Sequence, residues 1–304
     1  MYKKMLVLLD GSKLAEVVFS YAKELSGRLG VDLDLLYVCT AQQVQQMHMI
    51  ETYVESMAAR LQAQSEEVRN KAYLKPGKKA LKVTGRVAVG YPAEEILKYT
   101  DANKVDLIML ATHGASGDLS LGLGSVAEKI IRGSKIPVWL VPGALHPGII
   151  YDKIPQRNIL VPLDGSKQAE AAIPHAVNLA KQRGVDTRIV LITVSKPVNT
   201  RLSAEERQTI IGKDIRSLRT TGEVYLNKMV KQLIDAGLTA ESEQLVGDPA
   251  EEIVRYAART EPRVIVMCTH GHSGFRRFVF GSVTENVLHR LQKTPLFLIK
   301  TSQQ

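Results

Sequence analysis

The 304-residue chain is longer than a typical single domain of roughly 100 to 200 residues, so two domains are expected. Its hydrophobic content of 45% and charged content of 23% are typical of a soluble globular protein and exclude disordered, collagen-like and disulfide-scaffold chains. The net charge of +9 is compatible with a nucleic-acid surface, but the dense basic run from Lys75 to Lys82 has no interleaved aromatic residue, so a nucleic-acid partner is not expected.

Membrane insertion and secretion are not expected either. The opening apolar run is ended by Asp10, Gly11 and Ser12 before a signal peptide can form, and no apolar stretch approaches the ~20 residues that span a bilayer. Cys39 and Cys268 lie in different halves without metal-ligand spacing, so we expect reduced structural thiols and no metal site. A cytoplasmic location follows from these expectations.

Two halves of the sequence repeat one another. LVLLDGSKLAE at Leu6 returns as LVPLDGSKQAE at Leu160, an offset of 154 residues. VGYPAEEILKY at Val89 returns as VGDPAEEIVRY at Val246, an offset of 157, so a small net insertion lies between the two blocks. Gly and Pro are frequent between the copies, which predicts a domain at 1–143, a linker at 144–157 and a second domain at 158–304.

Each copy alternates short apolar runs with helical patterns. This order predicts two α/β domains, each a doubly wound parallel sheet with helices on both faces. Asp248 and Pro249 have the chemistry of a helix start, whereas Tyr91 at the equivalent position cannot cap. Pro174 should kink the helix after Ser166. The expected strands are Met5 to Leu9, Leu33 to Val38, Leu81 to Val89, Val105 to Ala111, Val138 to Val141, Ile159 to Leu163, Ile189 to Val194, Val264 to Cys268 and Leu296 to Ile299.

Ligands of such sheets bind beyond the carboxyl ends of the strands, where two loops of each copy should meet. One loop is Asp-Gly-Ser after the first strand, and the other carries Gly114 and Gly124-Ser125, or Gly271 and Gly281-Ser282. Glycines and a helix start together expose amides that suit phosphate. The same residues can also be explained by structural roles that need no ligand.

Ser125-x-x-Glu128 and Ser282-x-x-Glu285 have the form of capping boxes. Asp10 and Asp164 either close a local turn or accept hydrogen bonds from a ribose or an adenine. His113 and His270 are expected to satisfy backbone groups rather than to act in catalysis, and His270-x-His272 has too few partners for a metal.

These motifs resemble the universal stress protein family over nearly both halves: the LDGS opening, VGxPAEE, THG-x9-GSV and a closing proline-led strand. The resemblance implies five-stranded sheets in the order 3-2-1-4-5, ATP, ADP or AMP as ligand with or without Mg²⁺, and an internal pseudo-dimer of the two domains through their last strands, with a further homodimer also compatible. It implies that the nucleotide is held by Asp10, Val38, Ala111, Gly114, Gly124, Ser125 and Val126, and by Asp164, Val194, Gly271, Gly281, Ser282 and Val283.

The copies depart from the family motif G-x2-G-x9-G-S/T at its first glycine. Ala111 is small enough to be tolerated there, whereas Cys268 could crowd the ligand. Inside the loop, Asp118 opposes phosphate in the first copy while Arg276 and Arg277 favour it in the second. Unequal sites are therefore expected.

The resemblance implies a nucleotide-binding regulatory protein of the stress response that acts through conformation and an unidentified protein partner. The chain has no GxxxxGK[ST] loop and no evident general base, so at most slow ATP hydrolysis is expected, and not an efficient enzyme. The alternative is a nucleotide-independent dimerisation module of the same family, which the missing first glycines favour. An enzyme of the wider adenine-nucleotide α-hydrolase group ranks last, because LDGS lacks the second glycine of a pyrophosphatase loop.

Overall fold

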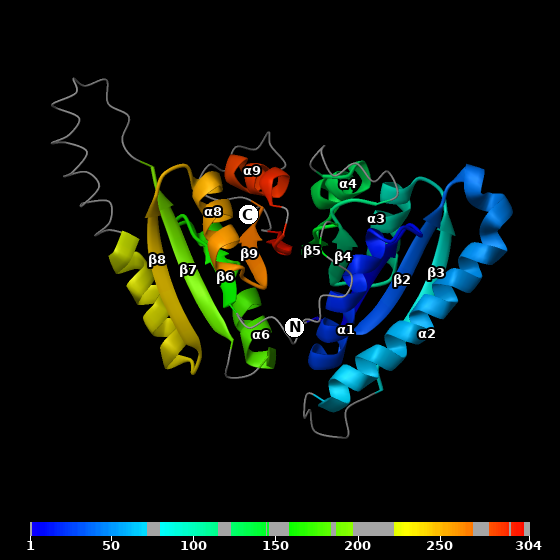
Figure 1. Cartoon of the computed structure of the whole chain (residues 1–304), viewed down its shortest axis with the longest axis horizontal. Helices are drawn as coiled ribbons and strands as arrows, with labels where there is room; N and C mark the ends of the chain where they lie inside the picture. The colour runs from blue at the N-terminus through cyan, green and yellow to red at the C-terminus, as the bar shows by residue number, and fades with distance from the viewer. Residues whose placement is uncertain are drawn as a thin grey trace. The chain divides into compact units, whose positions relative to one another are not determined.

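The computed structural model describes residues 2–71, 80–114, 123–143, 145, 158–183, 187–196, 222–269, 280–291 and 293–300. It divides into two compact units, Met1–Pro155 with Pro295–Ser302, and Gln156–Thr294 with Gln303–Gln304. Of the expected linker at 144–157, only Leu145 lies within the described residues, so that boundary stays a prediction. Figure 1 shows the helices and strands of both units.

The first unit contains a doubly wound parallel sheet. Its strands lie in the order β3-β2-β1-β4-β5, with parallel pairing throughout these five, which confirms the order 3-2-1-4-5. The strands are β1 (Lys4–Leu9), β2 (Asp32–Cys39), β3 (Val83–Val89), β4 (Leu107–Ala111) and β5 (Val138–Val141). The central strands β1 and β4 are buried along almost their whole length, because helices cover both faces.

Two pairs of helices cover this sheet, and right-handed crossovers assign one pair to each face. Helix α1 packs on α2, and α3 packs on α4 (Figure 1). The helices are α1 (Val18–Leu29), α2 (Met47–Lys71), α3 (Pro92–Ala102) and α4 (Ser125–Gly133), with short 3₁₀ segments at Ala15–Val17 and Ala41–Gln46. The crossover direction reverses between β1 and β4, and this point positions the site.

The second unit repeats the arrangement with strands in the order β8-β7-β6-β9. Its parallel strands are β6 (Asn158–Pro162), β7 (Arg188–Ser195), β8 (Thr239–Val246) and β9 (Val264–Cys268). Its helices are α5 (Lys167–Glu170), α6 (Ile173–Arg183), the helical residues 222–235, α8 (Pro249–Thr260) and α9 (Ser282–Arg290). The prediction of tandem doubly wound α/β domains is confirmed.

Strand β8 has no counterpart among the apolar runs of the sequence. It lies at the edge of its sheet, beside β7 alone among the described strands, and carries polar residues such as Glu241, Ser242 and Glu243. No residue of β8 is fully buried. An edge strand of this kind needs no continuous apolar run, so hydrophobicity gave no signal for it.

The last strand of the sequence, β10 (Leu296–Ile299), belongs to the first unit by its contacts. It pairs antiparallel with β5, Phe297 opposite Trp139, and these two buried rings lie 4.9 Å apart. Tyr2 packs edge-on against Phe297 at 5.9 Å. Lys300 follows the strand and donates to the carbonyl oxygen of Ile131 near the end of α4.

Two predictions about helix starts have different outcomes in detail. Asp248 caps α8, because its carboxylate accepts from the amides of Ala250 and Glu251, while Tyr91 makes no side-chain cap. The helix after Ser166 is interrupted between α5 and α6 as expected. Pro174 falls in the first turn of α6, where a missing amide costs little, and the first repeat has a similar change of helix type at Val17 to Val18 without a proline. Proline alone therefore does not explain the break.

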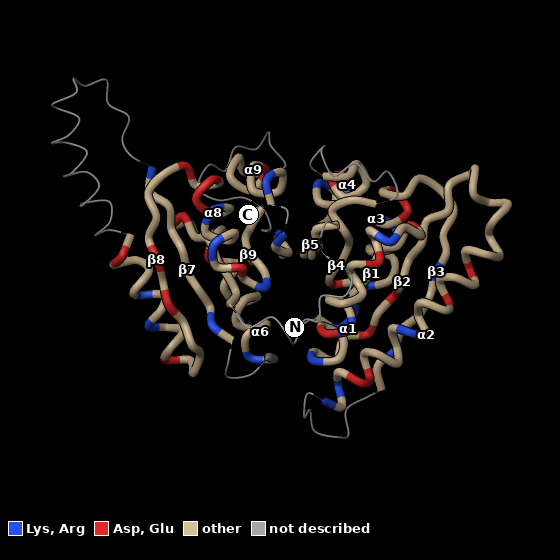
Figure 2. The backbone as a smooth tube through the Cα atoms, in the orientation of Figure 1, with Lys and Arg blue, Asp and Glu red and all other residues tan. Residues whose placement is uncertain are grey.

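Charged residues of both signs are interspersed along the helices, as Figure 2 shows for α2 and α8. On α2, Lys71 pairs with Glu67 and Arg69 with Glu66, which are exposed or partly exposed contacts of small energetic value. Of the basic run from Lys75 to Lys82, the described part includes only Lys82 among the lysines. No helix in the described ranges is long and apolar enough to cross a bilayer.

Candidate functional site

A cavity of about 300 Å³ lies at the carboxyl ends of β1 and β4 in the first unit. These strands are neighbours, and the chain direction of the crossovers reverses between them, which is where doubly wound sheets bind ligands. We call it the first cavity. All seven residues that the sequence assigned to the first site line it: Asp10, Val38, Ala111, Gly114, Gly124, Ser125 and Val126.

The loop after β1 is held by the side chain of Asp10. Its Oδ1 accepts from the amide of Ser12 at 2.9 Å and from the Ser12 hydroxyl at 2.6 Å, while Ser12 Oγ accepts from the amide of Ala15 at 3.1 Å. Gly11 has φ +80°, a conformation that favours glycine. The local-turn reading of Asp10 is therefore correct, and the turn aims the carboxyl group at the cavity.

The loop after β4 comes close to that carboxyl group. A Cβ placed on Gly114 would lie 2.0 Å from Asp10 Oδ2, and one on Gly124 would lie 3.0 Å from the carbonyl oxygen of Thr112. The amide of Gly124 donates to the same Thr112 carbonyl at 2.8 Å. Close approach of the Asp10 side chain at Gly114 and of the Thr112 backbone at Gly124 therefore favours glycine at both positions.

Helix α4 starts at the cavity with a glycine as its N-cap residue. Gly124 is the N-cap residue, with φ −62° and ψ 145°, and as a glycine it has no side chain to cap the first turn. Helix α9 starts in the same way at Gly281. The capping-box reading of Ser125 and Ser282 is thus wrong, because both serines are already helical and sit one position too late. The uncapped first turn leaves donors and the positive dipole end for an anion.

The rest of the first cavity is apolar. Val38 at the end of β2 and Leu110 on β4 line it, together with Pro92 and Ile96 from the start of α3. Ala111 occupies the position of the missing first glycine and is buried. A cavity with one polar end and one apolar end suits an amphipathic small molecule better than a bare anion.

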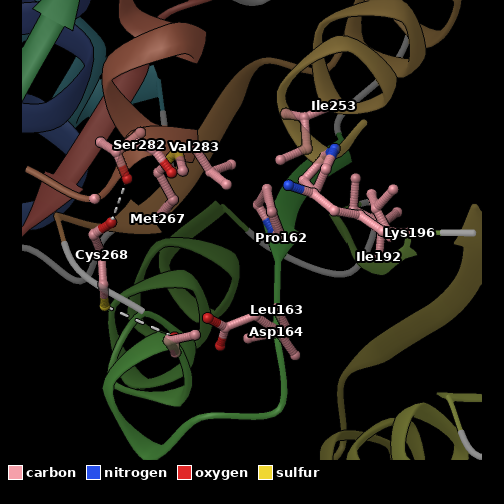
Figure 3. Close-up of a pocket in the computed structure, with 15 residues that line it drawn as sticks. Pro162, Leu163, Asp164, Ile192, Lys196, Ile253, Met267, Cys268, Ser282 and Val283 are labelled. Atoms are coloured by element: carbon pink, nitrogen blue, oxygen red, sulfur yellow. Dashed lines mark hydrogen bonds between the residues drawn. The ribbon is translucent and has the colours of Figure 1, made fainter. Parts of the chain in front are cut away.

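An equivalent cavity of about 270 Å³ lies in the second unit (Figure 3). We call it the second cavity. Asp164, Val194, Gly281, Ser282 and Val283 line it as the sequence analysis expected, while Gly271 lies outside the described residues. Asp164 repeats the turn of Asp10, accepting from the Ser166 amide at 3.0 Å and hydroxyl at 2.6 Å. The two units therefore build one type of site twice.

Cys268 stands in the second cavity where Ala111 stands in the first. Its thiol is directed at the carbonyl oxygen of Ala169 on α5, 3.7 Å away, and burial raises the pKa of this thiol to about 12 (Figure 3). The neighbouring Thr284 hydroxyl donates to the Cys268 carbonyl at 3.0 Å. The side chain is thus packed against helix α5 as a neutral thiol.

His113 lines the first cavity, but its ring contacts the side chain of Thr112 and not a backbone group as expected, and its Nε2 is buried without a hydrogen-bond partner among the described residues. Its Nδ1 lies 2.9 Å from Thr112 Oγ1, and that hydroxyl accepts from the amide of Gly143 at 3.0 Å. His270 and His272 fall outside the described residues, as do Asp118, Phe275, Arg276 and Arg277. Within the described part of the chain, no group of three or more His, Cys, Asp or Glu side chains is placed to hold a metal ion.

Sequence reasoning missed several lining residues. Pro92 and Ile96 in the first cavity correspond to Pro249 and Ile253 in the second, and all four come from the repeated PAEEI stretch. That repetition was a usable signal, but the stretch was interpreted only as a helix start. Lys196 was also missed, since a single lysine after a strand has no distinctive pattern.

Comparison with known proteins agrees with this architecture. The pattern of the universal stress protein family matches residues 1–142 and, a second time, residues 156–300. The chain belongs to the universal stress protein family. Universal stress protein Slr1230 of Synechocystis sp. is 25% identical over 306 residues, which cover 95% of this chain and 96% of that protein.

Other relatives match about half of the chain. Universal stress protein MJ0531 of Methanocaldococcus jannaschii is 31% identical over 144 residues, 47% of this chain and 82% of that protein. Among solved structures, a universal stress protein from Archaeoglobus fulgidus has a TM-score of 0.66 at 19% identity and covers 99% of this chain and 97% of its own. The last likeness shows the fold alone.

Proposed function

We propose that this universal stress protein binds an adenine nucleotide in each of its two cavities and regulates the stress response through conformation and a protein partner. The observation that carries the proposal is the uncapped start of α4 and α9 at the rim of two equivalent cavities. Backbone donors at a positive helix end suit phosphate, and the apolar remainder suits a base.

The nucleotide would lie across the sheet in each cavity. Its phosphates would meet the amides at the start of the helix, near Gly124 and Ser125 or Gly281 and Ser282. Asp10 or Asp164, at the end of the central strand, would accept from the ribose, and the backbone at Val38 or Val194 would meet the base. Each role follows the order of the strands that carry these residues.

The described linings support binding more than catalysis. Each contains one carboxyl group, Asp10 or Asp164, and in both cases Oδ1 is engaged by a serine amide and hydroxyl. A general base needs a proton acceptor within reach of the attacking water. We therefore propose at most slow ATP hydrolysis, with any Mg²⁺ held mainly by the phosphates.

The pairing of β10 with β5 supports an internal pseudo-dimer through the last strands of the two repeats. It is also the observation that favours the alternative function, a nucleotide-independent interaction module, because the aromatic contact of Trp139 and Phe297 needs no ligand. A cytoplasmic location and a further homodimer remain part of the proposal.

Mass spectrometry of small molecules released from the purified full-length protein tests the proposal. We expect adenine nucleotide to be recovered, and calorimetry of the stripped protein to give two ATP sites per chain. Absence of both co-purified nucleotide and millimolar ATP binding would leave the interaction module as the better description.

Ser125→Asp and Ser282→Asp provide the matching variants. Both serines are exposed at the first helical position, where an aspartate stabilises the helix while its charge repels phosphate. We expect each variant to lose one ATP site, with a drop in affinity of roughly 10- to 100-fold at that site. Gln232→Glu, an equal charge change on the helical residues 222–235, should keep both sites. Retention of both sites in the double serine variant would contradict the proposal.

A further inference from the structure

The two cavities differ where the second strand of each repeat ends. In the first unit, Thr40 follows β2 and caps the 3₁₀ segment Ala41–Gln46. Its amide donates to Gln43 Oε1 at 3.0 Å and its hydroxyl does so at 3.1 Å. Among the described residues that line the first cavity, Val38 is the one that comes from β2.

The second cavity has a cationic side chain at the equivalent place. Lys196 follows β7 directly and lines the cavity with Ile192 and Val194. These three residues alternate along the chain, so they share one face of the strand. Figure 3 shows the Lys196 side chain extending toward the space between Ile253 and Pro162.

The backbone of Lys196 lies at the end of the second cavity that is opposite Gly281 and Ser282. The strands β7, β6 and β9 are consecutive neighbours, and Gly281 and Ser282 lie on the β9 side. Neighbouring strands are about 4.8 Å apart, so the two ends of the cavity are separated by about 10 Å. This is a sufficient span to place the phosphates at one end and the base at the other. Lys196 would therefore meet the base.

The chemistry of lysine then selects the base. An ammonium group donates three hydrogen bonds and accepts none. Guanine presents the acceptors O6 and N7 side by side, whereas adenine presents N7 beside an amino group that only donates. We infer that Lys196 makes the second cavity a site for 6-oxopurine nucleotides, which it binds at least as tightly as adenine nucleotides. This inference rests on the proposed function. It adds that the second cavity binds 6-oxopurine nucleotides as well as adenine nucleotides, unlike the first.

Solvent exposure limits the contribution of Lys196 to nucleotide affinity. Hydrogen bonds to charged groups contribute more than neutral ones, but Lys196 is exposed, so we expect a contribution of about 5- to 10-fold in affinity. The described lining of the first cavity has no cation from the end of β2, so we expect no such gain for GTP there.

The experiment is calorimetric titration of GTP and of ATP, each with Mg²⁺, into full-length protein carrying Ser125→Asp, which leaves the second cavity as the intact site. We expect GTP to bind at least as tightly as ATP. Adding Lys196→Thr should weaken GTP by about 5- to 10-fold and ATP by less than about 2-fold. Lys196→Arg should preserve the preference because its guanidinium also only donates. Lys228→Thr, which removes an exposed lysine from the helical residues 222–235, should change neither value.

The outcomes separate the inference from the function beneath it. An ATP-to-GTP ratio that Lys196→Thr leaves unchanged, or ATP binding with no detectable GTP binding, overturns the inference and leaves the proposed function intact. Failure of both nucleotides to bind overturns both. The converse variant Thr40→Lys, titrated in protein carrying Ser282→Asp, should raise the GTP affinity of the first cavity relative to ATP.

Discussion

In the first repeat the second strand is followed by Thr40, which caps the next segment, whereas in the second repeat it is followed by Lys196, which lines the cavity. The described starts of the helices on the other side of the two cavities are alike. Gly124 and Gly281 both start a helix without a side-chain cap, and both donate to a threonine carbonyl at 2.8 Å. In the first cavity, close approach of other atoms favours glycine at positions 114 and 124, whereas the position after the second strand is a threonine in one repeat and a lysine in the other.

The largest predicted change in stability concerns the last strand of each repeat, β5 and β10. Phe297 of the second repeat is fully buried on Trp139 of the first, so Phe297→Ala should lower the free energy of unfolding of the first unit by about 3–5 kcal/mol. Trp139 is the single tryptophan of the chain, so its fluorescence during urea unfolding reports this unit. Phe297→Leu, which keeps most of the volume, should cost much less. A change below about 1 kcal/mol for the alanine variant would show that β10 does not pack there.

The residues that follow the last strands also differ, and this predicts a dependence on pH. Pro142 follows β5, whereas Lys300 follows β10, and burial lowers the pKa of Lys300 to about 8. In the unfolded chain this amine binds its proton up to about pH 10.4. Between these values the unfolded state binds more protons, so stability contributed through Lys300 rises with pH over this range and is lowest below pH 8.

Lys300→Met tests this sign. Relative to the variant, the native chain should gain about 1–2 kcal/mol of unfolding free energy between pH 8 and pH 10, a value reduced from the full shift because the side chain is partly exposed. Urea unfolding followed by Trp139 fluorescence measures it. Lys98→Met, which removes an exposed lysine, is the control. A difference that is flat with pH would show that Lys300 is solvated.

The smallest effects concern the starts of α3 and α8. Asp248→Ala should lower the unfolding free energy of the second unit by about 1 kcal/mol because it removes the cap on the amides of Ala250 and Glu251. Tyr91→Asp should raise that of the first unit by about 0.5–1 kcal/mol, since Tyr91 is 77% exposed and caps nothing. Thermal unfolding followed by circular dichroism measures both. Equal behaviour of the two positions would contradict the assigned difference.

Most of the cavity residues were predictable because their signals are local. A glycine at a fixed distance from a helix start, or an aspartate directly after an apolar run, is visible in a short stretch of chain. The rule that parallel strands present their carboxyl ends at one edge then brings Asp10, Gly114 and Gly124 together. The position of Ser125 relative to the helix start was not predictable in this way. If the helix began one residue later, Ser125 would be the N-cap residue of a capping box, whereas in the structure Gly124 is the N-cap residue.

Each repeat has a hydrogen bond between a tyrosine and a glutamate, but the two tyrosines do not align in the sequence. The Tyr53 hydroxyl donates to Glu16 Oε1 at 2.8 Å, and the Tyr225 hydroxyl donates to Glu170 Oε1 at 3.0 Å. The two glutamates align in the repeat, but Tyr53 follows Cys39 by 14 residues whereas Tyr225 follows Ser195 by 30. The second repeat is therefore longer before the helix that carries this tyrosine and shorter after it. The two changes nearly cancel, so the net offset between the repeats is small.

The sequence by itself determined the duplication, the doubly wound sheets and most of the described residues at the glycine end of each cavity, since these depend on short-range patterns and general topological rules. Only the tertiary structure decided that β10 packs in the first unit, that Lys196 reaches the second cavity and that helices α4 and α9 begin uncapped. Each of these depends on contacts between segments far apart in the chain. The energies of such contacts cannot be inferred from a short stretch of sequence.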